Sequence, residues 1–169
     1  AGEFGAGIGG NGVRPEDIEG LVGKGLGNQV GMHVYDASPF FDFNLTQFSD
    51  QYRGEWKDNS NWLKLAFHAH ANEPARPYQD APAEQVIRDF DKIGEQIVRF
   101  AGEETYSPTT VVHWGMIRPE TYKPLYEQGV RALSGYFRKN RAGVWDINYR
   151  LDDVRSEYLS RHDAWKDFE

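Results

Sequence analysis

The chain contains no cysteine, so it can form neither a disulfide framework nor a reactive thiolate. It has no apolar run near the roughly 18 residues of a membrane-spanning helix, so no membrane span is predicted. It also lacks a basic excess: 19 Lys and Arg against 26 Asp and Glu give a net charge of −7, which argues against a nucleic-acid partner. No signal peptide is visible at the start, which leaves the compartment open, with the cytoplasm favoured.

What the chain does contain is typical of one folded domain. It has 169 residues, of which 39% are hydrophobic and 27% are charged, a balance that argues against disorder of the whole chain. No internal repeat marks a second domain. The sequence gives no indication of the oligomeric state.

Glycine is concentrated at the start of the chain, where residues 1–31 hold eleven of the 18 glycines. The segment "GAGIGG" at 5–10 has the glycine spacing of a dinucleotide-binding loop, but that motif needs a preceding strand, and only four residues precede it. We therefore expect residues 1–12 to form a flexible glycine-rich leader and residues 13–169 to form a single α/β domain.

Strand-like and helix-like segments alternate through the rest of the chain. A short helix is expected to begin at "RPEDIEGL", and a hairpin-like pair is expected in 138–151. Alternation at this spacing predicts βα units and a mostly parallel sheet, either open or closed into a barrel. The expected strands are 30–37, 61–69, 109–115 and 131–137, and the expected helices are 45–56, 80–102, 118–130 and about 152–165.

The helix expected near 80–102 has the clearest periodicity. Its apolar residues are spaced by four, three, four and three positions, which places them on one face of an α-helix. Asp80 is the expected cap at the start, and Gly102 is the expected end. The predicted buried residues are Val86, Phe90, Ile93, Ile97 and Phe100.

Two histidines lie near the end of the strand "WLKLAFHAH". Successive strand side chains point to opposite faces, so Leu63, Leu65 and Phe67 are expected to pack under helices. His68 and His70 are expected on the other face, at the carboxyl end of the strand, where parallel α/β folds place functional groups. Two imidazoles on one face can bind a single cation such as Zn²⁺.

The strand "TVVHWG" repeats this arrangement one βα unit later, with His113 at its end. Three strand-end histidines predict a metal or general-base cluster of His68, His70 and His113. The alternative is that each is a half-buried polar residue bonded to a loop carbonyl. For His33, in mid-strand, and for His162, in a charged terminal helix, the structural interpretation is favoured.

Other candidate residues surround these histidines. The proline-rich loop after His70 contributes Arg76 and Tyr78, which could bind a substrate hydroxyl or carboxylate. Asp36 and Asp42 follow the first clear strand, and either could act as a metal ligand, a general base or a turn former. The aromatic residues that could contact the apolar face of a sugar, or fill the core, are Trp114, Tyr136 and Trp145.

The run from "FNLTQFSDQYRGEWKDNSNWLKLAFHA" through "VIRDFDKIGEQIVRFAGEE", "SPTTVVHWG" and "LYEQGVRALSGYF" resembles a divergent branch of the polysaccharide deacetylase superfamily. The resemblance covers about three quarters of the chain. It implies a distorted or incomplete (β/α) barrel with mostly parallel strands.

The resemblance also implies a function: a metal-dependent hydrolase that removes an acyl group from an N- or O-acylated carbohydrate. A divalent metal such as zinc would be held by His68 with His70 or His113. Asn72 stands where members of the superfamily usually have a second histidine, and no "DD" pair precedes His68. The alternative is a non-catalytic carbohydrate-binding or interaction module. The resulting site prediction assigns catalysis to Asp36, Asp42 and His113, substrate binding to Arg76, Tyr78 and Trp114, and metal binding to His68, His70 and His113.

Overall fold

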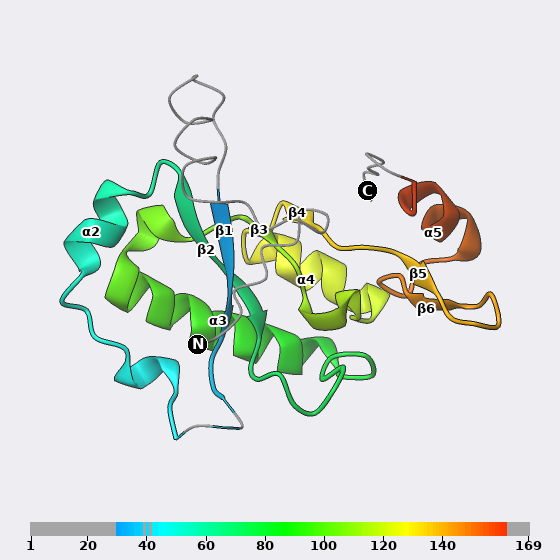
Figure 1. Cartoon of the computed structure of the whole chain (residues 1–169), viewed down its shortest axis with the longest axis horizontal. Helices are drawn as coiled ribbons and strands as arrows, with labels where there is room; N and C mark the ends of the chain where they lie inside the picture. The colour runs from blue at the N-terminus through cyan, green and yellow to red at the C-terminus, as the bar shows by residue number, and fades with distance from the viewer. Residues whose placement is uncertain (1–29, 39, 41, 162–169) are drawn as a thin grey trace.

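The computed structural model of the chain describes residues 30–38, 40 and 42–161. Three predictions lie outside the described residues: the leader at 1–12, the helix that was expected to begin at Arg14, and the structural role of His162. The described part is a mixed fold of helices and short strands (Figure 1). The strands are β1 (Val30–Tyr35), β2 (Leu63–Ala69), β3 (Thr109–Thr110), β4 (Ala132–Leu133), β5 (Arg138–Lys139) and β6 (Trp145–Ile147). The α-helices are α2 (Arg53–Asp58), α3 (Ala83–Ala101), α4 (Tyr122–Glu127) and α5 (Asp153–Leu159), with 3-10 turns at Leu45–Gln47, Glu103–Thr105, His113–Gly115 and Pro119–Thr121.

Parallel strand pairs form the centre of the fold, as the alternating pattern predicts. β1 pairs with β2, and β3 pairs with β4. A parallel bridge between Leu65 and Tyr106, with a 2.8 Å hydrogen bond from Ser107 N to Leu65 O, connects β2 to the segment before β3. The described strands do not close into a continuous sheet, so the barrel stays a prediction.

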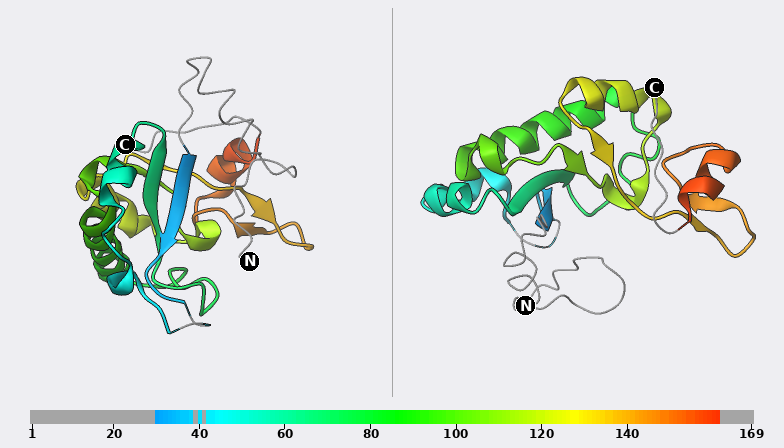
Figure 2. Two further views of the ribbon diagram at one scale, coloured as in Figure 1. Left: turned by 60° about the vertical axis from the view of Figure 1, so that its left-hand side comes forward. Right: turned by 90° about the horizontal axis from the view of Figure 1, so that it is seen from above.

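Helices α2, α3 and α4 lie on one side of the strands (Figure 2). All five residues predicted for the buried face of α3 are at most 5% exposed, and Leu65 and Phe67 pack against them in the same core. Gly102 ends the helix with φ of 95°, as its conformational freedom allows. Asp80 is not the cap: Pro82 holds that position, and Asp80 pairs with Arg150. None of the described helices is both long and apolar enough to cross a membrane.

Several elements are shorter than the sequence suggests. The strand predicted for 109–115 ends at Thr110, and His113 lies in a 3-10 turn because Trp114 (φ 62°) and Gly115 (φ 56°) adopt left-handed backbone conformations. The helix predicted for 45–56 is split into a 3-10 turn and α2. Its first cap is Asn44, whose side chain accepts a hydrogen bond from the backbone N–H of Thr46.

The remaining length predictions are also too long. Within 131–137, where a strand was predicted, only the two residues of β4 form a strand. Within 118–130, where one helix was predicted, there are a 3-10 turn and α4. The described part of the last helix is α5, which begins after Asp152, whose side chain accepts a hydrogen bond from Arg155 N.

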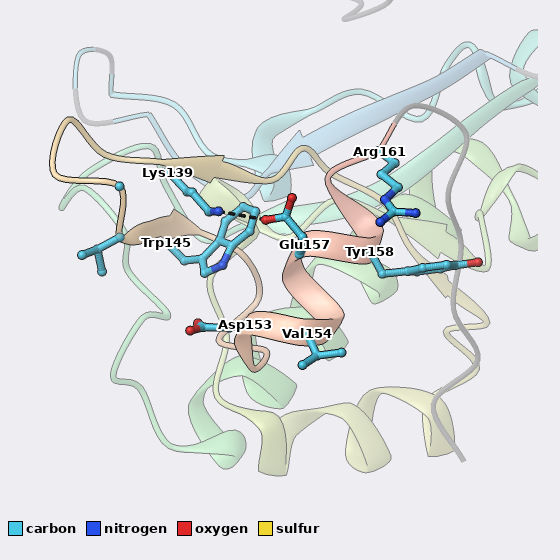
Figure 3. Close-up of a pocket in the computed structure, with 9 residues that line it drawn as sticks. Lys139, Trp145, Asp153, Val154, Glu157, Tyr158 and Arg161 are labelled. Atoms are coloured by element: carbon cyan, nitrogen blue, oxygen red, sulfur yellow. Dashed lines mark hydrogen bonds and ion pairs between the residues drawn. The ribbon is translucent and has the colours of Figure 1, made fainter.

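The C-terminal hairpin β5–β6 and α5 enclose a pocket of about 640 Å³ (Figure 3). The Lys139 ammonium lies 4.6 Å from the centroid of the Trp145 ring and 2.8 Å from Glu157 Oε2. One face of Trp145 is therefore already covered by a cation, which leaves this ring poorly placed to stack on a sugar.

Candidate functional site

The carboxyl ends of the parallel strands bring three ring side chains together. Tyr35 is the last residue of β1, His68 lies near the end of β2, and His113 follows β3. The ring centroids are 4.9 Å apart for Tyr35 and His68, and 5.0 Å apart for His68 and His113. These contacts confirm that the His68 ring lies near the carboxyl end of β2, beside Tyr35 and His113.

The hydrogen bonds of His68 determine which of its nitrogens carries the proton. Its Nδ1 atom bonds to the carbonyl oxygen of Val111, which can only accept, so Nδ1 carries the hydrogen. In neutral His68 the Nε2 atom is therefore an acceptor. It lies 3.1 Å from Nδ1 of His113, which must then be the donor. The two imidazoles form one directed hydrogen-bond chain.

Tyr35 and Asn72 extend this chain toward the surface. The Tyr35 hydroxyl lies 2.9 Å from His113 Nδ1 and donates to Asn72 Oδ1 at 3.3 Å. His113 is only 8% exposed, and its Nε2 atom has no hydrogen-bond partner among the described residues. His113 is therefore buried, whereas His68 and Tyr35 are partly buried.

Burial keeps both imidazoles neutral. Loss of solvation, the largest cause, together with proximity to His113 and His33 lowers the pKa of His68 to about 4, against the raising effect of the Val111 carbonyl. Burial also lowers the pKa of His113. At neutral pH both rings therefore carry a lone pair, as a metal ligand or a proton acceptor requires.

The donor set can be compared with the needs of a divalent metal. Two ligands of a tetrahedral zinc at 2.0–2.1 Å are about 3.4 Å apart, close to the 3.1 Å between His68 Nε2 and His113 Nδ1. Binding a metal through His113 Nδ1 would require the hydrogen of that ring to move to Nε2. The Val111 carbonyl orients His68 as an outer partner of a metal ligand would. However, catalytic zinc typically has three protein ligands, and the described residues contain no group of three His, Asp or Glu that could hold a metal. The described residues therefore do not by themselves fit such a site.

His70 does not join His68 and His113, contrary to the three-histidine prediction. β2 ends at Ala69, so the alternation of faces stops before His70. Its Nδ1 atom instead lies 2.9 Å from Oδ2 of Asp36. A carboxylate oxygen at this distance favours the tautomer of neutral His70 with its hydrogen on Nδ1, which leaves the lone pair on Nε2 of the half-exposed ring.

Asp36 is the buried centre of a second polar cluster. It is 2% exposed, and its Oδ2 atom also accepts from Lys92 Nζ of α3 at 2.6 Å. Its Oδ1 atom has no hydrogen-bond partner among the described residues. The Lys92 ammonium compensates the charge of a carboxylate that burial would otherwise make costly.

The sequence suggested that Tyr78 binds a substrate. In the structure Tyr78 instead belongs to this buried polar cluster. Its ring is fully buried against Phe67. Its hydroxyl accepts from His70 N at 2.8 Å and donates to Asp89 Oδ2 at 2.9 Å. Burial raises the pKa of the Tyr78 hydroxyl, so the group stays protonated and keeps donating to Asp89.

A pocket of about 550 Å³ opens beside both clusters, at the end of β1. Two of its lining residues, Tyr35 and Asn72, are hydrogen-bonded to each other, and Tyr35 contacts His113. A third lining residue, Asp36, contacts His70. The exposed aromatic side chains of Phe40 and Phe43 contribute to its walls. It is lined by Tyr35, Asp36, Ala37, Ser38, Phe40, Phe43 and Asn72.

The other predicted site residues are arranged differently. The Arg76 guanidinium donates to Asp146 Oδ1 at 2.7 Å and lies 5.4 Å from the centroid of the Trp114 ring. Arg76 is thus engaged within the protein, whereas Trp114 is 37% exposed and lies beside His113, with 6.0 Å between ring centroids. Asp42 is exposed and does not line the pocket.

Sequence reasoning missed four members of these clusters as site residues. Lys92 and Asp89 lie outside the apolar face of α3, an amphipathic helix. Charged residues at such positions are ordinarily solvated, so no signal in the sequence marks these two as members of a site. Tyr35 had a local signal, since it directly precedes Asp36 at the end of a strand. Asn72 entered only as a departure from the superfamily pattern.

Comparison of the chain with protein-family models, with curated proteins and with solved structures found no match. The resemblance to the polysaccharide deacetylase superfamily therefore stays a prediction based on the residues quoted above. The chemistry of the site has to be argued from its own geometry.

Proposed function

We propose that the chain is a hydrolase that removes an acyl group from an N- or O-acylated carbohydrate, with His70 as its general base. The observation that carries the proposal is the 2.9 Å contact between His70 Nδ1 and Asp36 Oδ2, because Asp36 lines the neighbouring pocket and so connects His70 to it. A base oriented by a carboxylate beside a cavity is the arrangement that general-base catalysis needs. The fold that goes with this proposal is the distorted or incomplete (β/α) barrel that the resemblance implies.

The reaction follows from the protonation of His70. Its Nε2 atom takes a proton from a water molecule whose oxygen attacks the acyl carbonyl carbon. The side-chain N–H groups of Asn72, whose Oδ1 atom accepts from the Tyr35 hydroxyl, are the donors that the pocket wall offers to the developing oxyanion. The imidazolium then returns the proton to the leaving amine or alkoxide as its bond to the acyl carbon breaks, and a carboxylic acid is released.

The aromatic side chains support a carbohydrate as the substrate. Phe40 and Phe43 are 72% and 43% exposed and line the pocket together with Asp36 and Asn72. Sugar rings present an apolar face and a rim of hydroxyl groups, which match aromatic walls and polar side chains, respectively. Trp114, exposed beside His113, could extend the contact to a second sugar.

Metal dependence remains a separate prediction of the resemblance. His68 and His113 are the described residues that would hold a divalent ion, which would supply Lewis-acid chemistry at this edge of the sheet. They provide one ligand fewer than a catalytic zinc site normally has. The proposal therefore assigns the proton transfer to His70, and elemental analysis of untagged protein tests the metal prediction independently.

The experiment is acetate release from an acetylated chito-oligosaccharide by the wild type, His70→Ala and His33→Ala. His33 is the control because it is an exposed histidine of β1 that packs beside His68, with 5.6 Å between ring centroids, whereas His70 is the described histidine paired with Asp36. We expect kcat to fall by roughly 10²–10⁴-fold in His70→Ala and to stay unchanged in His33→Ala. Binding of the oligosaccharide without acetate release by the wild type would instead support the non-catalytic carbohydrate-binding module.

A further inference from the structure

We propose that helix α3 positions His70 through two separate relays, one to its side chain and one to its backbone, with Lys92 and Asp89 as positioning residues. The inference rests on the proposed role of His70 as the base. It adds residues from a helix to a site otherwise built from strand ends and loops.

The first relay reaches the imidazole. Lys92 Nζ donates to Oδ2 of Asp36 at 2.6 Å, and His70 Nδ1 lies 2.9 Å from the same oxygen. The charged hydrogen bond from Lys92 restrains the rotation of the carboxylate and therefore the oxygen that faces His70. Lys92 also supplies the permanent positive charge that a carboxylate with a 1% exposed side chain requires. Lys92 therefore determines where Asp36 directs the ring of His70.

The second relay reaches the backbone of the same residue. The N–H of His70 donates to the Tyr78 hydroxyl, which donates to Asp89 of α3. Tyr78 is fully buried, so this hydroxyl is held by packing as well as by its hydrogen bonds. The backbone of His70, whose carbonyl also accepts from Ala37 N at 2.8 Å, is thus anchored on both sides just past the end of β2.

The two relays begin on one face of the helix. Asp89 and Lys92 are three residues apart, a spacing that places side chains next to each other on a helix surface. The adjoining face of α3 is held in the core by Ile93, Ile97 and their neighbours. A helix fixed by its core face can hold two points of His70 rigidly, as precise placement of a catalytic group requires.

The test compares Lys92→Met and Tyr78→Phe with two controls. Arg88→Met removes an exposed cation from the same helix, and Lys92→Arg preserves a charged donor toward Asp36. The readouts are kcat and KM for acetate release and the hydrogen-bonded Nδ1 proton of His70 in nitrogen-15-labelled protein. Amide spectra establish that each variant is folded.

We expect Lys92→Met and Tyr78→Phe each to lower kcat by about tenfold or more, part of what a general base contributes, with KM nearly unchanged. The Nδ1 proton signal should broaden or disappear in both, and persist in Arg88→Met and Lys92→Arg. A folded Lys92→Met and a folded Tyr78→Phe that both retain the wild-type signal would overturn the positioning role. If the wild type releases no acetate, the proposed function fails. The Nδ1 proton signal of His70 in the variants then still tests whether Lys92 and Tyr78 position His70.

Discussion

His68 Nε2 lies 3.1 Å from His113 Nδ1, and the Val111 carbonyl on the other side of His68 fixes the direction of the hydrogen bond between them. This relationship requires His68 to be neutral, because protonation of Nε2 would put two N–H groups face to face. Burial accordingly lowers the pKa of His68 to about 4.

The first prediction is a loss of stability in acid. In the unfolded chain His68 has a pKa of 6.5, so it binds a proton at a pH at which the folded His68 does not. The contribution of neutral His68 to the free energy of unfolding is therefore complete above pH 6.5 and is lost as pH falls toward 4. The loss from His68 is at most on the order of 3 kcal/mol. It is measured by urea unfolding between pH 4 and 7.5.

His68→Asn is the control for this measurement, because its amide nitrogen can still donate to the Val111 carbonyl but does not titrate. We expect a shallower pH dependence in the variant, with the remaining slope due to groups such as His113, whose pKa is also lowered. Equal slopes in the wild type and His68→Asn would show that His68 titrates normally.

The second prediction concerns the orientation of His70. Asp36→Asn should lower kcat for acetate release by roughly 10²–10⁴-fold with little change in KM, because an amide no longer fixes the proton on Nδ1 of His70. Steady-state kinetics provide the measurement, and Asp42→Asn, an exposed position off the pocket, is the matched control. Equal loss in both variants would argue against a specific role for Asp36.

The third prediction concerns the support beneath the site. Ile93 is fully buried on α3, so Ile93→Ala should destabilise the protein by about 2–5 kcal/mol. Glu95→Ala, at an exposed position of the same helix, should change stability by no more than about 0.5 kcal/mol. Denaturant unfolding of the two variants measures the difference, and a similar small effect for both would mean that α3 is not docked on the strands.

The sequence predicted the elements whose periodicity is strong. The buried face of α3 and the place of His68 near the carboxyl end of β2 both follow from local spacing, and both predictions are confirmed. The amphipathic signal was clear because a helix of 19 residues samples its periodicity several times. β3, with two residues, offers no comparable signal, so the extent of its strand was wrong.

The candidate site could be predicted only in part, because its decisive contacts are long-range. The Asp36–His70 and Asp36–Lys92 pairs join residues far apart in the chain, and their formation depends on where β1 and β2 end. β2 ends at Ala69, so His70 is not held on the same face as His68. A strand one residue longer would have kept both histidines on one face. Periodicity identifies faces, but it does not place side chains beyond the last paired residue.

The most direct test of the central claim measures acetate release after exhaustive chelation, for the wild type, His70→Ala and His68→Asn. If His70 activates the water, the chelated wild type keeps its rate, His68→Asn remains active, and His70→Ala loses roughly 10²–10⁴-fold in kcat. The opposite result would contradict the account: a rate abolished by the chelator, restored by zinc and unaffected by His70→Ala.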